Sequence, residues 1–320
     1  MKKRIGVLTS GGDAPGMNAA VRSVTRTALA KGFEVIGILK GYNGLLNREF
    51  VQLDVRMVSD IIQRGGTMIY TARCPEFKEW ENIEKAKQIC EEKNMSGIVV
   101  IGGDGSFRGA ADLSKAGIPC VGIPGTIDND IQCSEYTIGY DTALNTVMEL
   151  VDKLRDTSRS HERCSVVEVM GRHAGHIALN AGIACGATAV LVPEVEHDMA
   201  KMIQRIKEVR ADGKKHIIIV VAEGVGGTED IAKTIHEETG IEARATILGH
   251  VQRGGSPTVR DRVLASEMGY YAVELLEQGI GNRVVGRKDG KVYDVDIQEA
   301  LSMKKPFDER LYKILNDINF

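Results

Sequence analysis

The chain has few prolines, few aromatic residues and no long apolar run. Only 7 of its 320 residues are proline and 5% are aromatic, so no proline-rich linker marks a domain boundary and aliphatic side chains must dominate the core. No segment approaches the roughly 18 apolar residues of a membrane-spanning helix. The first apolar run breaks after Leu8, short of a signal peptide. These absences lead us to expect a cytoplasmic protein.

Charge and cysteine are equally unremarkable, and each excludes a class of function. The formal net charge of −3 argues against a nucleic-acid binder, which needs a strong basic excess. The six cysteines form no CxxC pair, which argues against a zinc site and against a disulfide scaffold. Because the chain has no overall basic excess, any anionic ligand must be bound by a few locally placed groups.

Glycine, in contrast, is abundant. The 36 glycines make up about 11% of the chain, against an average near 7%. They follow no Gly-X-Y period, and 43% hydrophobic with 27% charged residues is typical of a globular protein. At a prior of about 150 residues per domain, the length predicts two domains.

Short apolar runs alternate with helical patterns along the chain. Nearly continuous apolar strands separated by crossover helices predict parallel βαβ units, so we expect an α/β fold. Asn18 is the expected N-cap of a first helix that ends at Gly32, and further helices are predicted over 81–92, 142–155 and 199–210. The predicted strands are 5–8, 35–39, 98–101, 120–123, 166–169, 189–192 and 217–222.

Glycine-rich turns follow several of these strands. They are Gly11-Gly12, Gly102 to Ser106, and the turn with Gly224, Gly226 and Gly227. Glycine lets a ligand approach the backbone, and the next helix presents free N–H groups, so phosphate is the expected guest. The alternative is that glycine only makes a tight turn. Neither a Walker A loop nor a GxGxxG turn is present.

Carboxylates stand in or near these turns. Asp104 is tolerable beside a phosphate if Mg²⁺ bridges the two, the alternative being a helix N-cap. Asp128 and Asp130, two apart in a loop, suit general-base work on a hydroxyl, although Asp is also common in loops for backbone reasons.

Basic residues cluster near the ends of the strands. Arginine binds phosphate bidentately and stabilises charge on a transferring phosphoryl group. Individually these residues could be solvated surface arginines, but together with the turns and acidic loops they predict a site for two phosphorylated ligands. They are Arg73, Arg163, Arg172 with His173, Arg244, and His250 with Arg253.

Five segments carry a family resemblance that runs in register over essentially the whole chain. They resemble the bacterial ATP-dependent 6-phosphofructokinases of the phosphofructokinase family, and they are LTSGGDAPGMNA (8–19), VVIGGDGS (99–106), GIPGTIDND (122–130), VVEVMGRHAG (166–175) and LGHVQRGGSP (248–257). The resemblance implies two similar Rossmann-like three-layer αβα lobes with the active site in the cleft between them. The ATP-binding lobe would comprise 1–138 plus 251–301, and the fructose 6-phosphate-binding lobe 139–250 plus 302–320.

The resemblance also implies the reaction, in which the γ-phosphate of ATP is transferred to the 1-hydroxyl of fructose 6-phosphate in glycolysis. Asp128 is then the general base, Arg172 stabilises the transferring group, and Thr126 and Asp130 orient the loop and the metal. Asp104 would hold Mg²⁺. The implied ATP-binding residues are Gly12, Arg73, Cys74, Gly103, Asp104, Gly105 and Ser106.

The implied sugar-phosphate site includes Thr126 and Asp128. It is completed by Arg163, Met170, Gly171, Arg172, Glu223, Arg244, His250 and Arg253. Arg163 and Arg244 resemble a pair that reaches across a subunit interface, which implies a homo-oligomer, usually a tetramer. Neither nucleic acid nor a membrane is expected as a partner.

A second, intersubunit site for ADP or phosphoenolpyruvate is implied by Arg22, Arg26, Arg155, Lys214, Lys215 and His216, although a solvated helix face is the simpler interpretation. Three residues depart from the familiar pattern. Val55 replaces an arginine, Thr188 a magnesium-binding glutamate, and Asp212 a basic residue. We therefore expect catalysis with weakened or altered regulation.

The phosphate donor is predicted from two glycines. Pyrophosphate-dependent relatives tend to carry Asp at the position of Gly105 and Lys at that of Gly125, whereas glycine at both leaves room for adenosine and the α-phosphate. The alternatives are a pyrophosphate-dependent enzyme and a sugar-phosphate-binding protein without catalysis. A nicotinamide-dependent oxidoreductase lacks its GxGxxG turn here.

Overall fold

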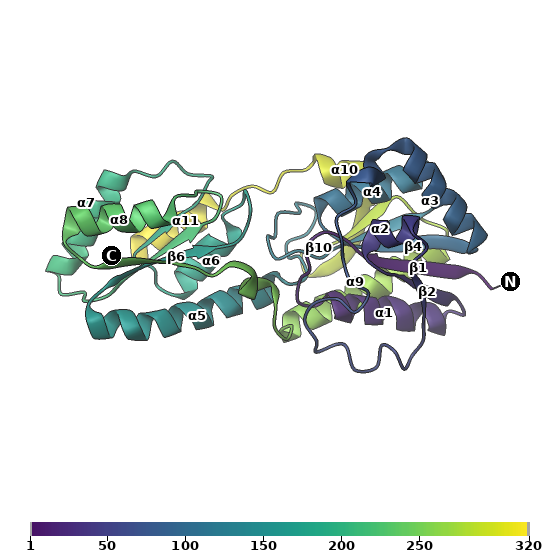
Figure 1. Cartoon of the computed structure of the whole chain (residues 1–320), viewed down its shortest axis with the longest axis horizontal. Helices are drawn as coiled ribbons and strands as arrows, with labels where there is room; N and C mark the ends of the chain where they lie inside the picture. The colour runs from purple at the N-terminus through teal and green to yellow at the C-terminus, as the bar shows by residue number, and fades with distance from the viewer. Residues whose placement is uncertain (1, 319–320) are drawn as a thin grey trace. The chain divides into compact units, whose positions relative to one another are not determined.

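The computed structural model describes residues 2–318 and divides the chain into two compact units (Figure 1). The first unit runs to Ile127 and adds Ile131–Thr142 and Arg253–Lys305. The second comprises Asp128–Asp130, Ala143–Gln252 and the chain from Pro306 onward. The chain therefore passes between the units several times.

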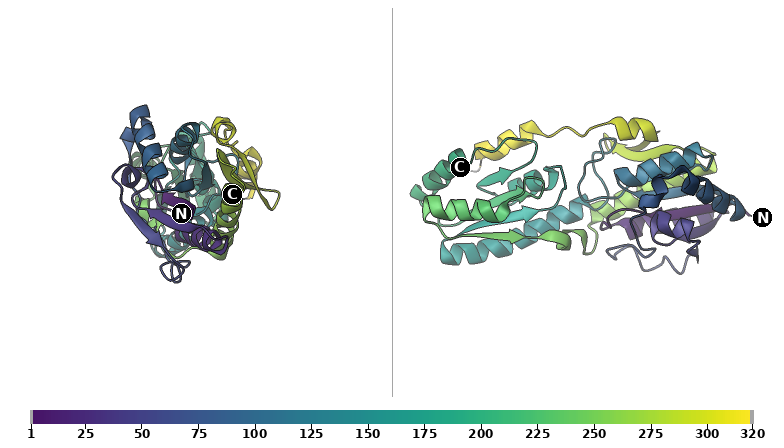
Figure 2. Two further views of the ribbon diagram at one scale, coloured as in Figure 1. Left: turned by 90° about the vertical axis from the view of Figure 1, so that its right-hand side faces the viewer. Right: turned by 45° about the horizontal axis from the view of Figure 1, so that its top comes forward.

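The first unit is built on a seven-stranded sheet with the order β11-β10-β5-β4-β1-β2-β3. The strands from β10 to β2 are parallel, and an antiparallel strand closes each edge. Both edges are visible in the left view of Figure 2, with β3 in purple and the β10–β11 hairpin in yellow-green. The bounds are β1 Arg4–Thr9, β2 Glu34–Ile38, β3 Phe50–Leu53, β4 Met95–Gly102, β5 Cys120–Pro124, β10 Arg283–Lys288 and β11 Lys291–Asp296.

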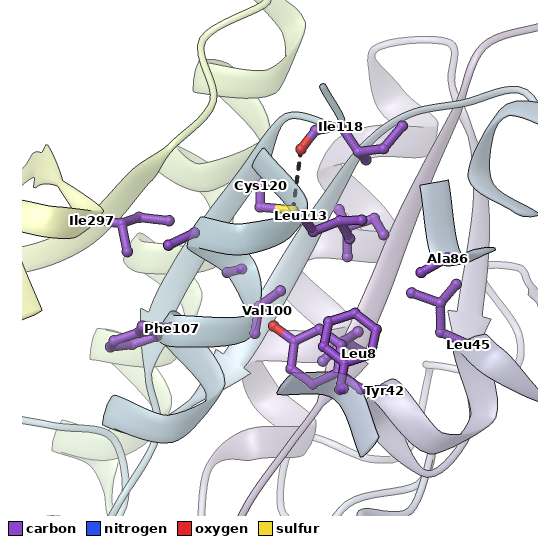
Figure 3. Packing of buried hydrophobic residues seen from close by; sticks show 14 of the residues in the cluster. Leu8, Tyr42, Leu45, Ala86, Val100, Phe107, Leu113, Ile118, Cys120 and Ile297 are labelled. Atoms are coloured by element: carbon purple, nitrogen blue, oxygen red, sulfur yellow. Dashed lines mark hydrogen bonds between the residues drawn. The ribbon is translucent and has the colours of Figure 1, made fainter. Parts of the chain in front are cut away.

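Helices cover both faces of this sheet. On one face α1 (Met17–Ala30) packs beside α9 (Val259–Glu277) (Figure 1). The opposite face carries α2 (Gly41–Leu46), α3 (Trp80–Glu92), α4 (Asp104–Lys115) and α10 (Ile297–Ser302), and the short helix η1 spans Pro75–Lys78. Figure 3 shows Leu8 and Val100 of the strands packed against Tyr42, Phe107 and other side chains of these helices. The core is mainly aliphatic, as the low aromatic content requires.

The second unit contains a parallel four-stranded sheet with the order β7-β8-β6-β9. Apolar side chains of α7 and α8, such as Ile206 and Ile235, pack on β6 and β8. The strands are β6 Cys164–Val169, β7 Ala189–Leu191, β8 Ile217–Ala222 and β9 Ala243–Ile247. The helices are α5 Tyr140–His161, α6 His176–Ala184, α7 Met199–Ala211, α8 Thr228–Thr239 and α11 Glu309–Ile318, and η2 spans Gly249–Arg253.

The predicted α/β class and all seven predicted strands are confirmed. The pattern missed β3, β9 and β11, which lie at sheet edges and have few buried positions, and it missed β10, which lies next to the edge strand β11. The expected N-cap was wrong. Gly16, with φ 108°, precedes the first helix, whereas Asn18 lies inside it and binds the 64–68 loop through the carbonyls of Arg64 and Gly65 and the N–H of Met68.

No helix among residues 2–318 is long and apolar enough to cross a membrane. All six cysteines are free thiols, and five of them are buried. The five buried cysteines pack among other buried side chains, as expected for thiols without a CxxC pair.

Candidate active site

Three glycine-containing turns of the first unit follow the neighbouring parallel strands β1, β4 and β5 and are joined by hydrogen bonds. The N–H of Ser10 donates to the carbonyl of Ile101 (3.0 Å), and that of Gly125 donates to the carbonyl of Gly102 (2.9 Å). The Ser106 hydroxyl donates to the carbonyl of Ser10 (3.0 Å). Because the carboxyl ends of parallel strands share one edge, these contacts bring the predicted turns at Gly11-Gly12 and Gly102 to Ser106 together with the turn after β5. The third predicted turn, which contains Gly224, follows β8 in the second unit.

The turn after β4 leads directly into α4. Gly103 is the N-cap residue of this helix and Asp104 lies in its first turn, so the alternative of Asp104 as N-cap is wrong. Glycine has no side chain to occupy the first N–H groups, which leaves them available to an anion. The half-exposed carboxylate of Asp104 lies 3.0 Å from Nη2 of Arg108. An added Cβ on Gly105 would meet no described atom within 4 Å.

The turn after β1 is packed against an arginine from η2. The Arg253 guanidinium donates to the carbonyl (3.2 Å) and the carboxylate (2.5 Å) of Asp13. A Cβ on Gly12 would lie 2.9 Å from its Nη2. Because Gly12 has no side chain, the Arg253 guanidinium can pack against this turn.

A neighbouring segment before η1 carries Arg73 and Cys74. It is tied to the first turn because the Thr71 hydroxyl donates to the carbonyl of Gly11 (2.7 Å). Arg73 is exposed and Cys74 is half-buried. Burial raises the pKa of the Cys74 thiol, so this side chain stays protonated at neutral pH.

The loop after β5 begins in the first unit, but its residues Asp128–Asp130 belong to the second unit, where they contact the loop after β6. Oδ2 of the buried Asp128 lies 3.3 Å from Nε of Arg172, whose side chain is 63% exposed. Asn129 (φ 52°) and Arg172 (φ 54°) both adopt the left-handed backbone conformation. Such strained residues concentrate at functional sites. A buried carboxylate beside an exposed guanidinium suits a base whose substrate arrives next to the cation.

Two polar side chains, one half-buried and one buried, accept hydrogen bonds from the backbone of the Arg172 loop. Glu223, which follows β8, accepts hydrogen bonds from the N–H groups of Gly171 (3.1 Å) and Arg172 (2.6 Å). Gln252, which is fully buried, accepts one from the N–H of Met170 (3.1 Å). The sequence reasoning missed Gln252, although it lies between His250 and Arg253 in the last motif.

Arg163 and Arg244 are brought together by a carboxylate that the sequence reasoning also missed. Glu242 accepts from Nε of Arg163 (2.7 Å) and Nε of Arg244 (2.8 Å). Hydrogen bonds from Arg163 and then Arg244 lower the pKa of Glu242. Arg244 remains largely exposed, as does His250. Two guanidinium groups on one carboxylate leave donor capacity for a phosphate.

A second group of basic side chains surrounds the end of α5. Nη1 of Arg155 lies 3.3 Å from Nε2 of His216, and its Nη2 contacts the carbonyl of Cys185. Burial, followed by Arg155 and Lys214, lowers the pKa of His216. Burial and nearby arginines likewise lower the pKa of Lys214. Positive charges that lower the pKa of Lys214 and His216 favour a bound anion.

The remaining residues predicted for the effector site have other ion-pair partners or belong to the first unit. Lys215 pairs with Glu162 at 2.9 Å. Arg22 and Arg26 lie on α1 in the first unit. No three His, Cys, Asp or Glu side chains of residues 2–318 are grouped as ligands for a metal ion.

Comparisons with known proteins show which family this chain resembles. The family model described as Phosphofructokinase matches residues 4–276. The chain is 59% identical to ATP-dependent 6-phosphofructokinase 1 of Clostridium perfringens (strain 13 / Type A) over 317 residues, which is 99% of each protein. It is 58% identical to ATP-dependent 6-phosphofructokinase of Clostridium botulinum (strain Hall) over 312 residues, 98% of each.

Solved structures share the fold of this chain. Phosphofructokinase from Saccharomyces cerevisiae superposes with a TM-score of 0.88 and 36% identity over 94% of this chain, which spans 45% of the yeast chain. A pyrophosphate-dependent phosphofructokinase from Marinobacter aquaeolei shares the fold, with a TM-score of 0.87 at 20% identity over 98% of this chain and 91% of that one. The strand order, the glycine turns and these matches together place the chain in the phosphofructokinase family.

Proposed function

We infer that the protein is an ATP-dependent 6-phosphofructokinase, a phosphotransferase that moves the γ-phosphoryl group of ATP to the 1-hydroxyl of fructose 6-phosphate. The names of the two Clostridium relatives at 58–59% identity support the substrate and the donor. The observation that carries the chemistry is the buried Asp128 carboxylate 3.3 Å from the exposed Arg172 guanidinium.

We assign the nucleotide to the first unit. Gly12, Gly103, Gly105 and Ser106 would line its phosphates, since their turns are mutually hydrogen-bonded and α4 presents its N-terminus there. Arg73 and Cys74 would lie near the adenosine. We propose that residues 1–138 and 251–301 form the ATP-binding lobe, as expected from the sequence.

Asp104 is the proposed ligand of Mg²⁺. A single carboxylate in the first turn of α4, with no group of three ligands among the described residues, fits an ion held by one protein oxygen together with phosphates and water. When bound, the ion would neutralise negative charge on the donor phosphates. The Asp104 carboxylate would exchange its exposed pairing with Arg108 for that role.

Asp128 is the proposed general base. It would accept the proton of the sugar 1-hydroxyl while that oxygen attacks the γ-phosphorus in line. Arg172 would move from the carboxylate to the transferring group, where added negative charge develops. Thr126 and Asp130, on the same loop, would orient it.

The sugar phosphate is assigned to the lobe of 139–250 plus 302–320. Glu223 and the backbone of 170–172 would contact the sugar, since Glu223 already organises that loop. His250 and Arg253 would also contact the substrate, and Arg163 and Arg244 would bind its phosphate. Arg163 and Arg244 would do so for a neighbouring subunit, so a homotetramer is part of the proposal.

We propose that effector control is altered. Arg155, Lys214 and His216 form a cation cluster, and Arg22, Arg26 and Lys215 would complete it in the oligomer. Thr188 is buried and its hydroxyl has no hydrogen-bond partner among residues 2–318, so this position offers no carboxylate for a cation. Val55 and Asp212 further reduce positive charge.

Titration of the initial rate with phosphoenolpyruvate tests the effector proposal. We expect weak inhibition at subsaturating fructose 6-phosphate. Strong sigmoidal inhibition that ADP relieves would refute it. Because ATP and sugar phosphates are the substrates, the cytoplasm is the proposed location.

A coupled assay tests the main proposal and its alternatives. The purified protein receives fructose 6-phosphate with ATP or with pyrophosphate, and formation of fructose 1,6-bisphosphate is followed. We expect turnover with ATP. Turnover with pyrophosphate alone would identify the other donor class, and binding of both ligands without turnover would identify a sugar-phosphate-binding protein.

A further inference from the structure

A carboxylate that the proposed mechanism does not use is enclosed in the first unit. Asp261 of α9 is 0% exposed. Its Oδ1 accepts a hydrogen bond from the N–H of Gly139 (2.9 Å). Its Oδ2 accepts two more, from the N–H (2.8 Å) and the hydroxyl (2.5 Å) of Thr142. Burying a carboxylate is costly unless such donors compensate.

These donors belong to the start of another helix. Because α5 begins at Tyr140, the N–H groups of Gly139 and Thr142 have no acceptor within the helix. Asp261 also lies in the first turn of its own helix, where its N–H donates to the N-cap Thr258 (3.3 Å). The carboxylate therefore lies at the positive ends of two helix dipoles. Burial raises its pKa, whereas the donors favour the charged form.

The Thr142 hydroxyl links the two helices further. It donates to Asp261 and accepts a hydrogen bond from the N–H of Thr258 (3.0 Å). The chain leaves the first unit directly after Thr142. The three residues thus fix the last segment of the first unit before the chain continues along α5.

The segment 137–139 connects this anchor to the proposed catalytic loop. The Thr137 hydroxyl donates to the carbonyl of Thr126 (2.6 Å), and the N–H of Ile138 donates to the carbonyl of Pro124 (2.9 Å). Gly139, the next residue, is held by Asp261. Thr137 and Ile138 therefore bind the start of the loop that carries Asp128, and Gly139 binds Asp261 of α9.

We propose that Asp261 is a positioning residue for phosphoryl transfer. This role rests on the function proposed above. Its ionised carboxylate holds Gly139 and Thr142, and through Thr137 and Ile138 it sets the position of the loop from Thr126 to Asp130. A small displacement of reacting groups is enough to cost about 100-fold in rate. A residue with this role affects the chemical step more than nucleotide binding.

The Asp261→Asn variant provides the main test. Asparagine has the same shape, but its NH₂ group must face either Gly139 or Thr142, which are donors themselves. We expect kcat of the folded enzyme to fall roughly 10- to 100-fold, while ATP affinity, measured by equilibrium binding, stays at the wild-type value.

Ser23→Ala is the matched control. Ser23 of α1 is buried and its hydroxyl donates to the carbonyl of Ser266 in α9 (2.6 Å), so the variant also loses a buried hydrogen bond to that helix. It does not touch the start of α5. We expect a lower melting temperature with unchanged kcat.

Thr142 supplies a second pair of variants in case Asp261→Asn fails to fold. Thr142→Ser keeps the hydroxyl, and Thr142→Val keeps the shape without it. We expect kcat to fall in Thr142→Val and to be close to the wild-type value in Thr142→Ser.

Amide hydrogen exchange over residues 124–139 makes the outcome independent of activity. Exchange should accelerate in Asp261→Asn but not in Ser23→Ala. Unchanged exchange, or a kcat that follows only the loss of stability as in Ser23→Ala, would overturn the positioning role. A wild-type protein without turnover would refute the proposed function, and exchange would still decide whether Asp261 holds the loop.

Discussion

Replacing Gly105 by aspartate should abolish most ATP-dependent activity without disturbing the fold. Gly105 lies in the first turn of α4, where an added Cβ meets no described atom within 4 Å. An acidic side chain in a first helical turn is itself stabilising by about 0.3–1 kcal/mol. At roughly 6 Å from a phosphate charge and an effective dielectric constant of about 20, however, it would repel that charge by about 3 kcal/mol, or roughly 100-fold in kcat/KM.

The assay is the steady-state kcat/KM for ATP at saturating fructose 6-phosphate, with Gly105→Ala and Gly105→Asn as controls for bulk. The controls should retain most of the activity. Gly125→Lys is a poorer probe, because a Cβ there would lie 3.1 Å from Cγ2 of Ile101 and 3.3 Å from Cε of Met17. If Gly105→Asp kept the wild-type kcat/KM, or if Gly105→Ala lost as much, the electrostatic reasoning would be wrong.

Three further predictions concern catalysis, stability and pH. Asp128→Asn should lower kcat by roughly 10²- to 10⁴-fold with little change in KM in steady-state assays, and near-normal kcat would exclude Asp128 as the base. Tyr42→Phe, which removes a buried donor to the carbonyl of Ser106 (2.6 Å), should cost about 1 kcal/mol in urea denaturation, and wild-type stability would contradict this. Burial and nearby cations lower the pKa of His216, and a bound polyanion should raise this pKa again. Phosphoenolpyruvate should therefore bind more tightly at pH 6 than at pH 8. Calorimetry that finds the same pH dependence of binding in His216→Gln would refute this coupling. In the free protein, the depressed pKa makes His216 unfavourable to folding below about pH 6.5 and neutral above it.

The sequence was sufficient for the buried strands and their glycine turns. Runs such as 98–101 and 217–222 are apolar throughout, because both faces of the sheet are covered. It was insufficient for β10 and β11, a hairpin at a sheet edge whose charged residues, such as Arg283 and Asp294, pair with each other. No local pattern announces such a pairing.

The supporting residues of the site were beyond sequence reasoning for a related reason. Gln252 contacts Met170 across 82 positions, and Asp261 contacts Thr142 across 119. Glu242 shares its carboxylate between Arg163, which directly precedes β6, and Arg244 of β9. Their roles arise only once the sheets bring distant segments together, whereas the glycine turns are encoded locally after each strand.

The protein is proposed to transfer the γ-phosphoryl group of ATP to the 1-hydroxyl of fructose 6-phosphate. The most direct measurement is phosphorus NMR of the purified protein incubated with Mg²⁺, ATP and fructose 6-phosphate. It should show ADP and fructose 1,6-bisphosphate accumulating in equal amounts. An unchanged spectrum, or ADP accompanied by free phosphate instead of a sugar bisphosphate, would contradict the assigned reaction.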